Sequence, residues 1–152
     1  MRFYKEVEMR QGEKWRPAIL MIRWLLAIVF LYAGVIKVFN PAAFAGDVAN
    51  YGMLPFWGVN LLAVVLPVLE VLCALLLIIG KWLRGVSLIL IVLNAVFIVA
   101  ISSAVIRGLD ISCGCFGTEA ARVGVKRIIE DILYMAGAVS IYIFNLQKGS
   151  SG

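Results

Sequence analysis

The chain contains no histidine, and only 15% of its 152 residues are charged. The absence of histidine excludes a histidine general base, a histidine-ligated haem and most zinc sites. Average soluble domains are about one quarter charged, whereas this chain is 63% hydrophobic and has a mean hydropathy of +1.00. The composition therefore excludes a soluble enzyme, a nucleic-acid-binding domain and a disordered tail, and indicates a protein whose surroundings are the lipid bilayer.

Four apolar runs account for this excess, over residues 18–39, 59–80, 86–106 and 128–144. Each is near the length that crosses about 30 Å of hydrocarbon as a helix. A lone spanning segment must be helical to satisfy its own backbone, and the short alternating segments typical of an outer-membrane barrel are missing. We therefore expect an all-α, polytopic membrane four-helix bundle.

The remaining residues flank this membrane domain, which we place at residues 18–144. Residues 1–17 form a charged segment that we expect on the cytoplasmic side. The first apolar run begins too late and is too long for a signal peptide, so we expect it to stay as an anchor. Residues 145–152 form a tail, and its last five residues resemble an engineered linker.

The distribution of Lys and Arg predicts an orientation with both termini inside. Cytoplasmic loops carry an excess of these residues. With the N-terminus inside, nine of the 14 Lys and Arg residues lie on the inner side, and the outer five are Lys37, Arg107, Arg122, Lys126 and Arg127. The segment before the fourth span, which holds two of the three cysteines, then faces the extracytoplasmic side, where disulfides persist.

The connection between the first two spans predicts a short helix. Asn40 followed by Pro41 is typical of a helix start. Phe44, Val48 and Tyr51 then share one face, which favours an amphipathic helix on the outer membrane surface. An ordinary re-entrant or surface loop is an equal alternative.

The sharpest local motif is Cys113-Gly114-Cys115-Phe116-Gly117. Two thiols that flank one glycine can close a small, strained disulfide ring, and strained disulfides exchange readily. Gly114 and Gly117 permit the tight backbone that this closure needs, and the basic residues nearby favour the reactive thiolate. The motif favours a redox dithiol, with a tight structural turn and a copper(I) site as alternatives.

Ionisable residues inside the spans form a second group of candidates. Glu70 and Asn94 lie roughly 16 Å below the outer ends of their spans, whereas Lys37 and Asp131 lie only about 3 to 5 Å below. We therefore expect Lys37 to pair with Asp131, and Glu70 to be neutral or bonded to Asn94, unless a kink at Pro67 raises Glu70 toward Lys37. These residues are either polar contacts between helices or a proton-handling or quinone-facing group.

Cys73 lies about 20 Å inside the second span, too deep for a bridge to the surface segment. We therefore interpret it as a small apolar filler. Two glycines within the spans, Gly34 and Gly137, permit close contact between helices.

The order of these features resembles the DoxX-like superfamily, and in particular its branch around the methylamine-utilisation protein MauE. The resemblance covers about residues 20–144. The residues that carry it are Gly34, Lys37, Phe44, Tyr51, Leu54, Pro55, Pro67, Glu70, Gly80, Gly108, the Cys113–Gly117 motif, Arg127 and Asp131.

The resemblance implies a multi-pass protein of the bacterial inner membrane that works with an extracytoplasmic thioredoxin-like partner. Cys113 and Cys115 would then exchange with that partner, and the polar core beneath them would be Lys37, Glu70, Asn94, Asp131 and Arg127. No metal is expected, and quinone is the one cofactor left open. The sequence leaves open whether the protein is a thiol–disulfide oxidoreductase, a non-catalytic assembly factor or a small proton-coupled transporter, and it leaves the oligomeric state open as well.

Overall fold

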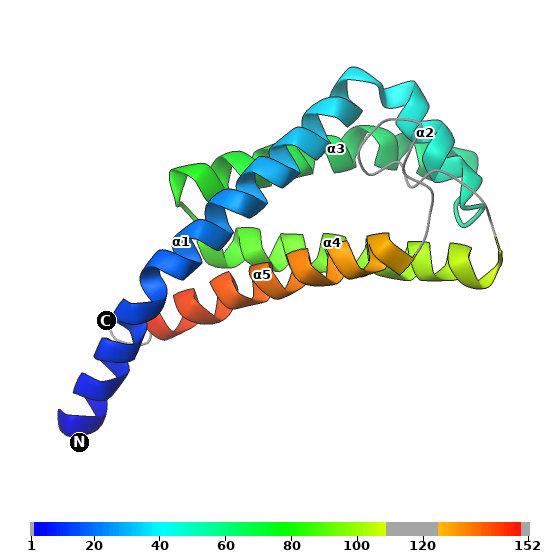
Figure 1. Ribbon diagram of the computed structural model, residues 1–152. Coiled ribbons are helices and arrows are strands. Elements are labelled where there is room, and N and C mark those ends of the chain that lie inside the picture. Colours follow the sequence, from blue (N-terminus) through cyan, green and yellow to red (C-terminus); the bar gives the residue numbers. More distant parts are fainter. Residues whose placement is uncertain (1, 109–124, 150–152) are drawn as a thin grey trace.

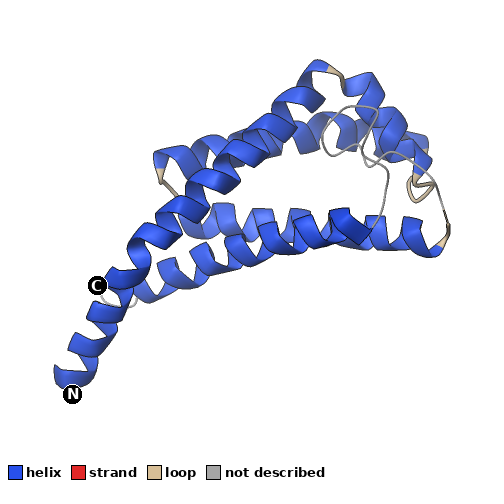
Figure 2. Cartoon of the chain, viewed as in Figure 1, coloured by secondary structure: helices blue, strands red, loops and turns tan. Residues whose placement is uncertain are grey.

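The computed structural model describes residues 2–108 and 125–149, and this part of the chain folds into five helices, the first four of which are joined by short connections (Figure 2). The helices are α1 (Arg2–Phe39), α2 (Pro41–Asn50), α3 (Phe56–Ile79), α4 (Leu83–Ile106) and α5 (Val125–Gly149). All but α2 are long and apolar enough to cross a bilayer. The prediction of an all-α polytopic membrane bundle is therefore confirmed.

The helices extend beyond the apolar runs that predicted them. α1 begins at Arg2 and contains Pro17 within its length. The spanning part of α5, Lys126–Gln147, has 22 residues and is longer than the predicted 128–144. The reason is physical: hydropathy reports the part of a helix that faces lipid, whereas polar turns continue the same backbone at either end.

The four long helices are arranged as two antiparallel pairs (Figure 1). α1 packs along α3, and α4 packs along α5. Contacts between the pairs, from α1 to α5 and from α3 to α4, are fewer. Figure 1 shows the pairs closest near the short α3–α4 connection and diverging toward α2. The two pairs therefore approach each other most closely at the end of the bundle that holds the α3–α4 connection.

Buried apolar residues hold the two helix pairs together toward the α3–α4 connection. The main cluster draws on all four long helices and includes Leu26, Leu77, Leu90 and Ile141, each at most 1% exposed. Cys73 belongs to the same cluster and is a free, buried thiol, which confirms its interpretation as a filler. Close packing of this kind holds the four long helices together.

Close approach of the paired helices depends on Gly34. A Cβ atom at this position would lie 2.8 Å from Val71 Cγ2 and 3.0 Å from the Val71 backbone nitrogen. Gly137 plays a similar part on α5, where a Cβ atom would lie 3.1 Å from Ile22 Cγ2. The expectation that these two glycines permit close helix contact is confirmed.

The predicted short helix is present as α2, and Pro41 occupies its first turn. Asn40 makes no side-chain capping hydrogen bond. The apolar face of α2 packs against α3, with Phe44 buried beside Ala63 and Leu66. α2 therefore lies beside the first turns of α3, which places the end of α1 alongside the middle of α3.

Two arginines connect helix ends to main-chain carbonyl groups. Arg107, just after α4, donates to the Tyr51 carbonyl at 2.8 Å. Arg84, at the start of α4, donates to the Asn145 carbonyl at 2.7 Å and 2.9 Å. The bond from Arg107 to Tyr51 joins the residue after α2 to the residue after α4.

We predict that Gly34→Ala destabilises the protein by about 1–3 kcal/mol, the usual effect of forcing a methyl group into a packed interface. Gly85→Ala is the matched control, because no atom lies within 4 Å of a Cβ there, and alanine favours a helix over glycine by roughly 0.5–1 kcal/mol. Unfolding in mixed detergent micelles measures both. Equal effects of the two substitutions would contradict the close approach of α1 to α3.

Candidate functional site

Among the described residues, the inward-facing stripe of each long helix carries one buried residue with a charged or amide side chain, and α4 also buries Ser87. Lys37 continues the stripe of α1, and Glu70 lies on the corresponding stripe of α3; both are at most 2% exposed. Asn94 of α4 is 2% exposed and Asp131 of α5 is 9% exposed. Burial of ionisable groups at membrane depth is costly, so these four residues are the candidates for a functional site.

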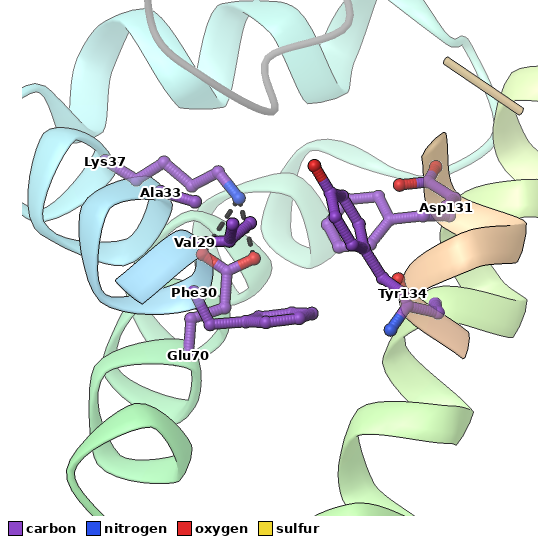
Figure 3. Close-up of a pocket in the computed structure, with 9 residues that line it drawn as sticks. Val29, Phe30, Ala33, Lys37, Glu70, Asp131 and Tyr134 are labelled. Carbon is purple, nitrogen blue, oxygen red and sulfur yellow. Dashed lines mark hydrogen bonds and ion pairs between the residues drawn. The ribbon is translucent and has the colours of Figure 1, made fainter. Parts of the chain in front are cut away.

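Lys37 and Glu70 form an ion pair. The Lys37 ammonium nitrogen donates to Glu70 Oε1 at 2.7 Å and to Oε2 at 2.8 Å (Figure 3). Both carboxylate oxygens are therefore engaged by one ammonium. The positions of the two side chains are set by α1 and α3, the helices that carry them.

This pairing corrects the expectation that Lys37 bonds to Asp131. Helix side chains lean toward the N-terminus of their own helix. Because α1 and α3 are antiparallel, Lys37 leans down along α1 while Glu70 leans up along α3, and the two charges meet between their Cα levels. The prediction measured depth from the span ends and treated those ends as level, whereas α2 places the end of α1 beside the middle of α3.

Two aromatic rings surround the same ammonium group. Its nitrogen lies 5.1 Å from the centre of the Phe44 ring on α2 and 5.2 Å from that of Phe97 on α4. Cations within about 6 Å of a ring face are attracted by the ring quadrupole. Lys37 of α1 therefore contacts residues from α2, α3 and α4 at one point.

Asp131 and Tyr134 face this ion pair from α5 (Figure 3). Asp131 Oδ2 is buried and has no hydrogen-bond partner within the part of the chain that the structure describes. Tyr134 packs edge-on against Phe30 of α1, with ring centres 6.3 Å apart. Asn94 donates to the Leu90 carbonyl at 2.8 Å, so the expected bond between Asn94 and Glu70 is not formed.

A small cavity lies between the ion pair and these groups. Its lining comprises Val29, Phe30, Ala33, Lys37, Glu70, Asn94, Phe97, Asp131 and Tyr134. The cavity has a volume of about 30 Å³. This volume is enough for one or two waters with polar partners. The arrangement is therefore suited to holding water or protons between charged groups.

Arg127 lies apart from this cavity, although the sequence grouped it with the polar core. Its guanidinium donates to Glu130 at 2.6 Å, and the two side chains are 20% and 28% exposed. The cavity lining does not include it. A partly exposed pair one helical turn long contributes little to stability.

The proposed dithiol, Cys113 with Cys115, lies outside the described residues, as do Gly114, Phe116 and Gly117. The described chain leaves α4 through Arg107 and Gly108 and resumes at Val125 in α5. The role of the cysteines therefore stays a prediction.

Sequence reasoning missed three residues of the site: Phe97, Tyr134 and the ring of Phe44 as a cation partner. Phe97 lies one turn beyond Asn94, and Tyr134 lies one turn beyond Asp131. Helical neighbours at this spacing share a face. A search of the sequence one helical turn after each polar residue would therefore have identified both.

Comparison with known proteins gives one family. Residues 16–144 match the family model described as methylamine utilisation protein MauE. The methylamine utilization protein MauE of Paracoccus denitrificans is 31% identical over 126 residues, which are 82% of this chain and 65% of the relative, just under two thirds of its length. That of Methylophilus methylotrophus is 33% identical over 140 residues, 90% of this chain and 73% of the relative. No solved structure matches the chain significantly.

We predict that breaking the buried ion pair from one side is more damaging than removing it entirely. Lys37→Met or Glu70→Leu alone leaves an uncompensated buried charge and should cost about 3–5 kcal/mol. The double variant removes both charges and should cost far less than the sum of the two. Unfolding in mixed detergent micelles gives the three values.

Glu130→Gln is the control for this cycle, because it breaks a partly exposed pair that we expect to contribute at most about 1 kcal/mol. Additive effects of Lys37→Met and Glu70→Leu would contradict a direct interaction between the two buried charges.

Proposed function

The chain belongs to the MauE family, and we propose that it is a membrane protein of methylamine utilisation that exchanges a dithiol for a disulfide with an extracytoplasmic thioredoxin-like partner. The observation that carries the proposal is the Cys113-Gly114-Cys115 sequence between two membrane spans. No other residue type in this histidine-free chain offers a comparable nucleophile. The family membership and the membrane helices support the setting of this chemistry.

The exchange proceeds through a mixed disulfide. The thiolate of Cys113 or Cys115 attacks a partner disulfide, which forms one inter-protein bond and releases one partner thiolate. The second cysteine then attacks the mixed disulfide, closes the ring between Cys113 and Cys115, and releases the second partner thiol. Two electrons pass to the partner in this direction, and the same steps in reverse oxidise the partner.

Two described features support a role for the bundle beneath the cysteines. Arg107, which leads into their segment, is tied to the Tyr51 carbonyl. Asp131 lies in the second turn of α5, the helix into which the segment leads, and lines the cavity beside Lys37 and Glu70. Both ends of the segment are thus attached to the part of the bundle that holds the polar cavity.

A quinone does not fit the cavity as it stands. Sites for organic ligands commonly measure about 300–1,000 Å³, whereas this cavity has about 30 Å³ of space for water-sized molecules. The donor set of Lys37, Glu70 and Asp131 is already partly used within the protein. The exchange proposed above therefore needs no electron transfer through this cavity.

The proposal places the protein in the bacterial inner membrane with both termini in the cytoplasm. The support is the distribution of Lys and Arg, nine inside against five outside out of 14. Disulfides persist in oxidising compartments, which agrees with an extracytoplasmic position for residues 109–124.

We predict that purified protein gains two alkylation sites on reduction. In the oxidised state, Cys113 and Cys115 are bonded to each other, so alkylation under denaturing conditions should label Cys73 alone. After reduction, the same treatment should label all three cysteines, and intact mass spectrometry counts the labels. A constant count of three, or two thiols that never become reducible, would contradict redox cycling.

The matched variants separate the cysteines. In Cys115→Ser, Cys113 cannot be resolved internally and should accumulate a mixed disulfide with the partner, which mass spectrometry of the trapped complex identifies. Cys73→Ser should trap nothing, because Cys73 is buried in the apolar core. A Cys113→Ser/Cys115→Ser variant with full activity in cells would instead favour an assembly role.

We predict that a membrane-impermeant maleimide added to reduced, intact spheroplasts labels Cys113 and Cys115 from outside. The control is a Cys113→Ser/Cys115→Ser variant with a single cysteine introduced at Ser150, which should react only after the membrane is opened. Labelling of Cys113 and Cys115 solely in inverted vesicles would overturn both the orientation and the extracytoplasmic partner.

A further inference from the structure

The charges around Asp131 are unequal in number. Among the described residues, the charged or titratable groups around it are Lys37 on α1, Tyr51 just after α2, Glu70 on α3, and Arg127, Glu130 and Tyr134 on α5, with the neutral Asn94 on α4. The two cations each engage a different carboxylate: Lys37 bonds Glu70 and Arg127 bonds Glu130. An ionised Asp131 would therefore add a third negative charge beside two cations that are each already bonded to another carboxylate.

The α2 groups do not balance this charge. Burial raises the pKa of Tyr51 to about 12, with Asp47 and Asp131 adding to the shift, so the phenol stays neutral at physiological pH. Asp47, the charged residue of α2, is an acid and supplies no positive charge. No cation from α2 compensates Asp131.

Burial makes an ionised Asp131 costly. The residue is 9% exposed, and its Oδ2 atom is buried with no hydrogen-bond partner among the described residues. An ionised carboxylate in a water-poor interior is strongly disfavoured unless it is paired, and it normally becomes neutral by taking up a proton. Glu70 differs, because both of its oxygens accept from the Lys37 ammonium.

We propose that the cavity is a proton-binding site in which Asp131 carries an exchangeable proton and the Lys37–Glu70 ion pair forms the fixed opposite wall. The protonated carboxyl group supplies an O–H donor where the structure shows an unpartnered oxygen. The space beside it is large enough for one or two waters, which give the proton a route to exchange. The two intramembrane acids thus have different roles: Glu70 binds the Lys37 ammonium, and Asp131 carries the exchangeable proton.

This inference does not rest on the dithiol chemistry. It requires only described residues, and the experiment below detects a proton rather than a disulfide. If Cys113 and Cys115 prove not to exchange, the proton site at Asp131 is unaffected. If Asp131 proves not to carry a proton, the disulfide exchange is unaffected.

The test is infrared spectroscopy of the full chain in lipid nanodiscs, which detects the carbonyl stretch of a protonated carboxyl group. We expect one such band per chain at neutral pH, shifted in heavy water and lost as the pH is raised. Carbon-13 labelling of aspartate should shift the band in the unaltered protein. The chain has three aspartates, Asp47, Asp110 and Asp131, so the label separates them from every glutamate without any substitution.

Variants then assign the band to one residue. It should vanish in Asp131→Asn and persist in Asp47→Asn, Asp110→Asn and Glu130→Gln. The absence of the band at neutral pH would overturn the proposal. A band that ignores the aspartate label and disappears in Glu70→Gln would also overturn it, because the proton would then reside on Glu70.

Discussion

The ion pair between Lys37 and Glu70 is the contact on which the arrangement of the helices depends. It joins the first and third helices where Gly34 lets their backbones meet. Phe44 and Phe97 then bring α2 and α4 to the same ammonium group. A buried ion pair is weak evidence for stability on its own, and its best-attested use is to fix register. Here it fixes the height of α1 against α3, which hydrophobic contacts between uniformly apolar helices do not specify.

The ion pair also determines what the facing helix can do. Since the lysine that lines the cavity is bonded to Glu70, Asp131 faces this pair with no hydrogen-bond partner for its Oδ2 atom in the described part of the chain. The polar interior is therefore asymmetric: the α1–α3 pair is charge-balanced, and the α4–α5 pair carries the titratable group. The asymmetry follows the division of the bundle into two helix pairs, with the cavity between them.

Much of this fold is accessible from the sequence. The spans can be predicted from hydropathy, because a lone segment in lipid can satisfy its backbone hydrogen bonds only as a helix. Four of the buried polar residues, Lys37, Glu70, Asn94 and Asp131, could be predicted because such groups are rare at membrane depth.

The pairing within that group was not accessible from the sequence. Counting residues along a span locates Cα atoms, whereas a lysine side chain reaches several ångströms down its helix, and a glutamate on an antiparallel neighbour reaches up. The count also assumed level span ends, which α2 prevents by packing Phe44 against α3. The motif at Cys113 and Cys115 is the reverse case. Its chemistry can be predicted from the sequence, whereas its residues lie outside the described structure.

The two arginine contacts at the helix ends share a chemical asymmetry. Arg107 and Arg84 each supply the side chain, while Tyr51 and Asn145 supply only a main-chain oxygen. Every amino acid carries that oxygen, so the accepting positions can change identity without losing the bond. The donating positions have no such freedom, because few side chains have both the length and the forked donors of a guanidinium. Substitutions that uncouple the α2 end from α4 are therefore confined to one partner of the contact.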